Sequence, residues 1–102
     1  MTIAWKVKIH TLVLSEDFKG MSLSAQRMIL SAIGKKLTFA PSEYGKPLRG
    51  ELKGYWKLRV GDYRVVCTMN KAEVQVLVIK VGIRRDEEVY RELFRRIRKL
   101  HE

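Results

Sequence analysis

Residues 55–67 have the pattern of a β-hairpin, and this stretch constrains the fold more than any other part of the chain. In residues 55–60, Trp, Leu and Val at even positions alternate with Tyr, Lys and Arg at odd positions. Such alternation places the two sets on opposite faces of a strand. Gly61 and Asp62 then predict a tight turn, because glycine supplies the positive φ that short hairpins need. The hairpin is therefore expected to pack one face on a core and to present cations on the other.

Hydrophobic periodicity predicts the elements that precede the hairpin. Alternation over residues 3–9 indicates a first strand with its odd-numbered apolar side chains buried. Residues 12–19 have a short helical pattern, and residues 23–39 have a longer one with an apolar stripe. Ser22 is the expected N-cap of the longer helix, and Pro41 is expected to end it.

The rest of the chain is predicted in the same way. Residues 41–54 contain both prolines and three glycines, which favours a loop. Residues 73–81 form a strand that is apolar on both sides, with positions 74, 76 and 78 on one face and 77, 79 and 81 on the other. A last helix is expected from Asp86, since acidic residues open it and basic residues crowd its end.

The predicted order is strand, helix, helix, three antiparallel strands, helix. This order is typical of an α+β fold in which helices pack against a small antiparallel sheet. The first strand is expected to pair within that same sheet. A length of 102 residues suits one domain, residues 1–102, with a single modest core.

Charge is the dominant compositional feature. The chain has 21 Lys and Arg against 11 Asp and Glu, a formal net charge of +10. A small domain with such an excess usually binds a polyanion, namely RNA, DNA, anionic lipid or an acidic protein. The alternative is a solvated surface that is merely basic.

Several features favour a cytoplasmic location. The longest apolar runs are too short to span a bilayer, and the N-terminus lacks the plan of a signal peptide. Cys67 is the single cysteine, so no internal disulfide can form, which fits a reducing compartment. No membrane partner is therefore expected.

Three basic places could form one site if the sheet brings them together. They are the hairpin face, the loop before it and the exit of the last strand, with Tyr90 following that exit. A cationic cluster beside a phenol suits a phosphodiester, since cations stabilise a dianionic transition state and a ring stacks on a base. A phosphate-binding face without chemistry explains the same pattern. The residues concerned are Arg49, Lys53, Lys57, Arg59, Arg64, Arg84 and Tyr90.

Other chemistries have less support. His10 and His101 lie at opposite ends of the chain, which disfavours a two-histidine ribonuclease site. Cys67 lies in an apolar strand and is expected to be an inert core residue. No Cys or His cluster has the spacing of metal ligands, and no glycine-rich phosphate loop is present.

Two segments together resemble the RelE/ParE superfamily of bacterial and archaeal toxins. They are K-P-L-R-G-E-L-K-G-Y-W-K-L-R-V-G-D-Y-R-V-V at 46–66 and V-L-V-I-K-V-G-I-R-R-D-E-E-V-Y at 76–90. The predicted element order also fits, so the resemblance covers essentially the whole chain. It implies a RelE-like fold of the microbial ribonuclease type.

The resemblance to the RelE side implies an activity. Such toxins cut mRNA in the ribosomal A site without metal or cofactor: the 2′-OH attacks the adjacent phosphate and leaves a cyclic phosphate and a 5′-OH. Carried over by position, Lys57 is a catalytic lysine, Arg64 stabilises the transition state, Arg84 is a general acid or phosphate clamp, and Tyr90 stacks on or orients the nucleotide. The implied RNA-binding residues are Arg49, Lys53, Tyr55, Arg59 and Arg85.

Two positions depart from the RelE pattern. Tyr55 stands where a second lysine can occur, and Ile83 stands where His or Lys is frequent. One alternative is a ParE-like inhibitor of DNA gyrase. Such members, however, typically lack a tyrosine at the position of Tyr90 and the full set of catalytic cations. Another is a member that only binds RNA or its antitoxin.

The resemblance also implies partners. These are an acidic, RelB-like antitoxin, the ribosome and mRNA. Charge complementarity with a +10 protein favours an acidic antitoxin.

Overall fold

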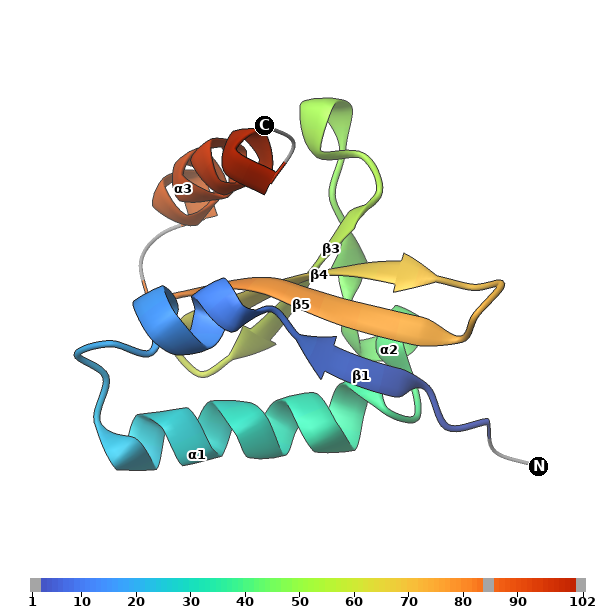
Figure 1. Ribbon diagram of the computed structural model, residues 1–102. Coiled ribbons are helices and arrows are strands. Elements are labelled where there is room, and N and C mark those ends of the chain that lie inside the picture. The colour runs from blue at the N-terminus through green and yellow to red at the C-terminus, as the bar shows by residue number, and fades with distance from the viewer. Residues whose placement is uncertain (1–2, 84–85, 101–102) are drawn as a thin grey trace.

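The computed structural model describes residues 3–83 and 86–100, and these form a five-stranded sheet with helices on both faces (Figure 1). The strands are β1 (Lys6–Ile9), β2 (Lys46–Pro47), β3 (Tyr55–Val60), β4 (Tyr63–Asn70) and β5 (Gln75–Gly82). The α-helices are α1 (Leu23–Ala32), α2 (Pro41–Tyr44) and α3 (Asp86–Leu100). Shorter helical turns are η1 (Val13–Asp17), η2 (Ile33–Leu37) and η3 (Gly50–Leu52).

The sheet has the order β1-β5-β4-β3-β2. The α+β class is confirmed, as are the three consecutive antiparallel strands β3, β4 and β5 and the place of β1 in the same sheet. The expectation of an antiparallel sheet is wrong at one edge, because β1 pairs with β5 in parallel. Apolar alternation reports which face of a strand is buried but not the direction of its partner, so the sequence left this pairing undetermined.

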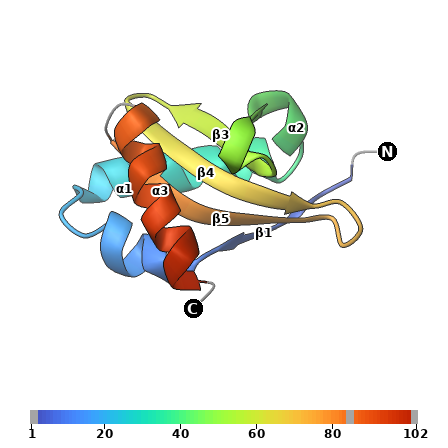
Figure 2. The ribbon, with the colours of Figure 1, turned by 90° about the horizontal axis from the view of Figure 1, so that it is seen from above.

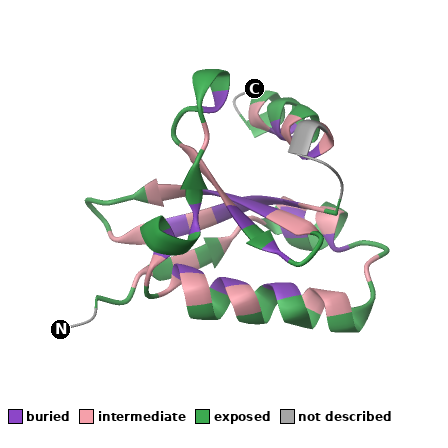
Figure 3. Ribbon diagram, turned by 180° about the vertical axis from the view of Figure 1, so that it is seen from behind, coloured by how far each residue is buried: buried purple, intermediate pink, exposed green. Residues whose placement is uncertain are grey.

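Two apolar clusters cover the two faces of the sheet, as the burial pattern in Figure 3 indicates. The larger lies between the sheet and α1 and includes the side chains of Leu58 and Val65. The smaller lies between the sheet and α3, with Val66, Val89 and Leu93 at its centre and Tyr55 at its margin. The face of β3 that carries the odd-numbered side chains is therefore only partly exposed to solvent. The basic surface on this face lies beside the second core.

The helices before the sheet differ from the predicted ones in detail. Ser22 caps α1 as expected, its Oγ accepting from the backbone N–H of Ala25 at 3.1 Å. The helical path then continues through η2, which approximates the predicted range 23–39. Pro41 also begins α2, since proline fits the first turn of a helix, where no N–H partner is required. The predicted loop 41–54 consequently contains α2, β2 and η3.

An irregularity in the β4–β5 pairing changes which side chains face α3. Val66 lies opposite Lys80, whereas Cys67 lies opposite Val78, so β5 has one extra residue at this point. As a result Val81 packs in the same cluster as Val76 and Val78, which corrects the predicted faces of this strand. The bulge also places Lys80 on the α3 side of the sheet.

A buried ionic network joins η1, β5 and α3. The Asp17 carboxylate accepts from Lys80 Nζ at 3.0 Å and from Arg96 Nη1 and Nη2 at 2.6 and 2.9 Å. It also accepts from the backbone N–H of Val81 at 2.8 Å. Burial opposes the charge of Arg96, but the hydrogen bonds and charges of Asp17 and Glu16 outweigh it and raise the pKa of the guanidinium. These contacts fix α3 on the sheet.

Close packing at Gly82 also positions α3. A Cβ added there would lie 2.7 Å from Cγ2 of Val89, so Gly82→Ala is expected to push the helix outward and lower the free energy of unfolding by about 1–3 kcal/mol. Gly34→Ala is the control, because a Cβ there meets nothing within 4 Å. This helical control is expected to gain up to about 1 kcal/mol. Urea denaturation of both variants measures the difference, and equal losses would contradict the packing argument.

Candidate functional site

Lys57 and Tyr90 meet although they lie on different layers of the fold. Lys57 is on β3, and Tyr90 is in the first half of α3, which crosses above the sheet (Figure 2). The Lys57 ammonium lies 5.9 Å from the centroid of the Tyr90 ring. The burial of Val89 and Leu93 against the sheet sets this position of the ring. The pairing of these two predicted site residues thus depends on α3 being docked.

Like charges face one another on the same side of the sheet. Arg59 on β3 is directly opposite Arg64 on β4, and Lys46 on β2 is opposite Lys57. Directly opposed like charges destabilise a sheet, and a bound polyanion relieves the repulsion. Arg64 is half-buried, and its Nη1 donates to the carbonyl of Tyr63 at 3.3 Å. This face is suited to bind phosphate.

The chain leaves β5 at a point beside Arg64. Gly82 is the residue opposite Arg64 in the β4–β5 register, and the exposed Ile83 follows it. The predicted Arg84 and Arg85 lie outside the described residues. Their assignment as phosphate clamp and RNA contact therefore stays a prediction.

The other predicted RNA-binding residues are distributed differently. Arg49 and Lys53 flank η3 and line a groove of about 550 Å³ with Trp56, which is separate from the Lys57–Tyr90 contact. Tyr55 is half-buried at the margin of the second core. The structure thus brings Lys57, Tyr90, Arg59 and Arg64 onto one face and places Arg49 and Lys53 in a separate groove.

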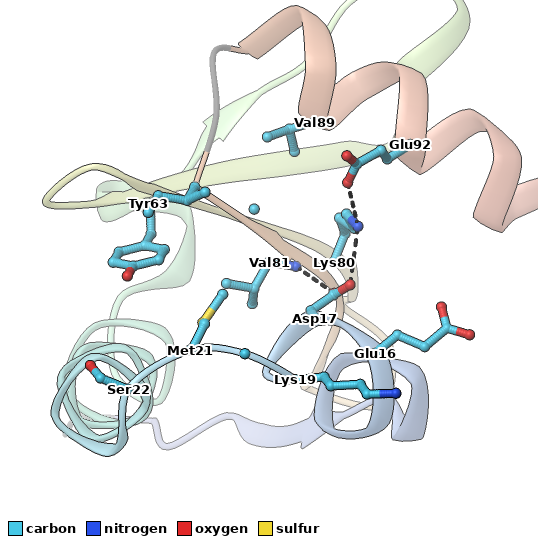
Figure 4. A pocket seen from close by; sticks show the side chains of 13 residues that line it. Glu16, Asp17, Lys19, Met21, Ser22, Tyr63, Lys80, Val81, Val89 and Glu92 are labelled. Carbon is cyan, nitrogen blue, oxygen red and sulfur yellow. Dashed lines mark hydrogen bonds and ion pairs between the residues drawn. The ribbon is translucent and has the colours of Figure 1, made fainter.

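A pocket of about 400 Å³ between η1, β5 and the start of α3 is a different kind of site (Figure 4). Asp17, Glu16 and Glu92 line it, and its Lys80 is already paired with Asp17 at 3.0 Å and Glu92 at 2.7 Å. Acidic lining and a neutralised cation make it unfavourable for phosphate. Sequence reasoning missed this network, although a lysine inside the apolar run of β5 signals a buried ion pair.

The described residues give no support to the remaining alternatives. Among the residues whose side chains the structure describes, 3–83 and 88–100, no group of three or more His, Cys, Asp or Glu side chains could hold a metal ion. In the same residues no helix has the length and apolarity to cross a membrane. His10 Nδ1 accepts from the backbone N–H of Leu12, and burial raises the pKa of the Cys67 thiol to about 12. Both side chains therefore have structural explanations.

Residues 18–88 match the family model described as ParE toxin of the type II toxin–antitoxin system parDE. The chain belongs to this toxin family. The RelE/ParE resemblance is thereby confirmed, and the protein is a toxin of a type II toxin–antitoxin system. A comparison with curated proteins gives no match.

Solved structures of RelE-type toxins share the toxin's fold. The Mycobacterium tuberculosis RelBE2 complex matches at 24% identity and a TM-score of 0.76, covering 84% of this chain and 98% of that one. A mutant of E. coli RelE bound to a RelBc antitoxin peptide matches at 26% identity and 0.61, covering 88% and 94%. The intact E. coli RelBE complex matches at 25% and 0.62, covering 80% and 99%.

Proposed function

We propose that this toxin is a ribosome-dependent endoribonuclease that cuts mRNA in the A site and stops translation. The observation that supports this most directly is the Lys57 ammonium against the Tyr90 ring, on the face that also carries Arg64. The family match supplies the toxin class, and the resemblance of the sequence to RelE-type toxins implies RNA as the target.

The proposed reaction is an internal displacement at phosphorus. The 2′-oxygen attacks the adjacent phosphate, the bond to the 5′-oxygen breaks, and the products are a cyclic phosphate and a 5′-OH. Lys57 assists proton transfer and Arg64 stabilises the charge on the equatorial oxygens. Arg84 donates a proton to the leaving oxygen or holds the phosphate, and Tyr90 orients the nucleotide by stacking. All of these steps use side chains of this chain and require no metal or cofactor.

The proposed partners follow from the charge of the toxin. An acidic, RelB-like antitoxin complements the basic face and neutralises it, and several of the related structures are toxin–antitoxin complexes. The ribosome and mRNA supply the anionic substrate. With these proposed partners, the proposed location is the cytoplasm.

A gyrase inhibitor is the second candidate. It is favoured by the match to the ParE family model and by Ile83, whose side chain is 54% exposed at a position where RelE-type toxins often have a cation. A member that binds RNA or antitoxin without cutting is the third, and Tyr55 in place of a lysine is its main support.

Induced expression in a bacterial host, followed by primer extension on a well-translated mRNA, separates these functions. We expect growth arrest with cuts inside codons of the translated message. The matched control is the same mRNA with its start codon removed, which is expected to stay intact. Growth arrest with intact mRNA would favour gyrase as target, and absence of arrest would favour the binding-only function.

A further inference from the structure

A small basic pocket lies at the β2 edge of the sheet and includes residues that were not assigned to the candidate site. Its volume is about 140 Å³, and it is lined by Lys36, Tyr44, Lys46, Lys57, Leu58 and Arg59. These residues come from η2, α2, β2 and β3, so four elements converge on it. Lys57 belongs both to this pocket and to the contact with Tyr90. The pocket is therefore continuous with the candidate site.

The charged side chains among the described residues that line the pocket are of one sign. None of the described residues that line it has a carboxylate, and no described carboxylate pairs with Lys36, Lys46 or Arg59. Lys46 is moreover directly opposite Lys57 on the neighbouring strand. Cations held this close repel one another unless an anion lies among them. The pocket is thus electrostatically complementary to an anionic group.

The aromatic ring at the pocket adds a second kind of contact. Tyr44 is 53% exposed, and the Lys36 ammonium lies 5.6 Å from its ring centroid. An exposed ring beside cations is the arrangement that single-stranded nucleic acids use, with phosphate on the charge and a base on the ring. The pocket is also smaller than the roughly 300–1,000 Å³ of pockets that enclose whole organic ligands, and its size suits one phosphate group.

We propose that this pocket binds a backbone phosphate of single-stranded RNA, with the neighbouring base stacked on Tyr44. The RNA strand then runs from Lys57 around the β2 edge of the sheet toward Lys36. This inference rests on the proposed function, since it extends the path of the same substrate. RNA is favoured over an acidic protein because the pocket shares Lys57 with the candidate cleavage site and has room for a single anionic group.

The test is binding of a fluorescent single-stranded oligoribonucleotide of about ten nucleotides, 2′-O-methylated to prevent cleavage, by full-length variants over a range of salt concentrations. The double variant Lys36→Gln/Lys46→Gln keeps unbranched polar side chains of similar length and removes two charges. If both lysines contact phosphate, the slope of log K against log salt falls by about 0.7 for each. Tyr44→Ala is expected to weaken binding roughly fivefold or more. The matched control is Lys6→Gln/Lys8→Gln on β1, at the opposite edge of the sheet, which is expected to leave the slope unchanged.

Each outcome decides the proposal. Equal decreases of RNA affinity and of its salt dependence in the two double variants would indicate attraction by net charge alone and overturn the pocket assignment. Unchanged RNA binding in the pocket variant would also overturn it, and weaker binding of an acidic antitoxin in that case would assign the pocket to the antitoxin. Cleavage of translated mRNA is measured in parallel. Cleavage by the toxin together with unchanged RNA binding in the pocket variant would support the proposed function and contradict the pocket assignment. RNA binding that depends on the pocket, without cleavage of mRNA, would support the pocket assignment and contradict the proposed function.

Discussion

Asp17→Asn is expected to lower the free energy of unfolding by about 3–5 kcal/mol, because it removes the buried anion that Lys80 and Arg96 share and leaves them only the half-exposed Glu92 and Glu16. The side chains of Asp17, Lys80 and Arg96 are 2%, 9% and 6% exposed. Asn keeps the shape of Asp and accepts through one oxygen, but it cannot balance charge. Urea denaturation followed by circular dichroism measures the loss.

Glu16→Gln is the matched control for this variant. Glu16 also pairs with Arg96, at 3.0 Å, but its side chain is 51% exposed. Exposed ion pairs contribute about 0–1 kcal/mol, so the control is expected to be nearly neutral. Similar losses in the two variants would contradict the view that burial of Asp17 makes the network important.

Lys57→Met and Arg64→Ala are each expected to reduce cleavage of translated mRNA by about 10²–10³-fold, the effect of removing one group that assists proton transfer or stabilises developing charge. Met retains most of the unbranched stem of Lys57 and loses only the ammonium that lies over the Tyr90 ring, so folding is expected to survive. The measurement is the rate of mRNA cleavage on purified translating ribosomes. Lys8→Met, on the exposed side of β1, controls for the loss of one positive charge.

Two variants of Tyr90 then separate its possible contributions. Tyr90→Phe keeps the ring beside Lys57, whereas Tyr90→Ala removes it. Full activity of the Phe variant together with a loss in the Ala variant would assign stacking, and a loss in both would assign a role to the hydroxyl group. Undiminished cleavage by folded Lys57→Met and Arg64→Ala would remove the proposed catalytic assignment altogether.

The elements that the sequence predicted correctly are those determined by local pattern. The hairpin of β3 and β4, the Ser22 cap and the amphipathic last helix depend on residues within a turn or two of one another. The parallel edge strand, the bulge in β5 and the partner of Lys80 depend on chain segments far apart, since Asp17 and Lys80 are separated by 63 positions. A local sequence pattern cannot predict such long-range pairings.

The residues of the candidate site were likewise only partly predictable from the sequence. The resemblance identified Lys57, Arg64 and Tyr90, and the structure places Lys57 beside Tyr90 and both Lys57 and Arg64 on the face that carries α3. Lys36, Tyr44 and Lys46 were missed because they belong to segments interpreted as a helix end and a loop. Only the paired register of β2 and β3 shows that Lys46 lies beside Lys57.

The docking of α3 makes the candidate site depend on contacts that lie far from it. Tyr90 faces Lys57 from this helix, and Arg96 of the same helix joins Asp17 across 79 positions. A change at Asp17 that loosens the helix is therefore expected to move the Tyr90 ring away from Lys57 without altering either residue. Lys57 and Arg64 lie on strands rather than on α3, so the same change would leave their basic face in the sheet.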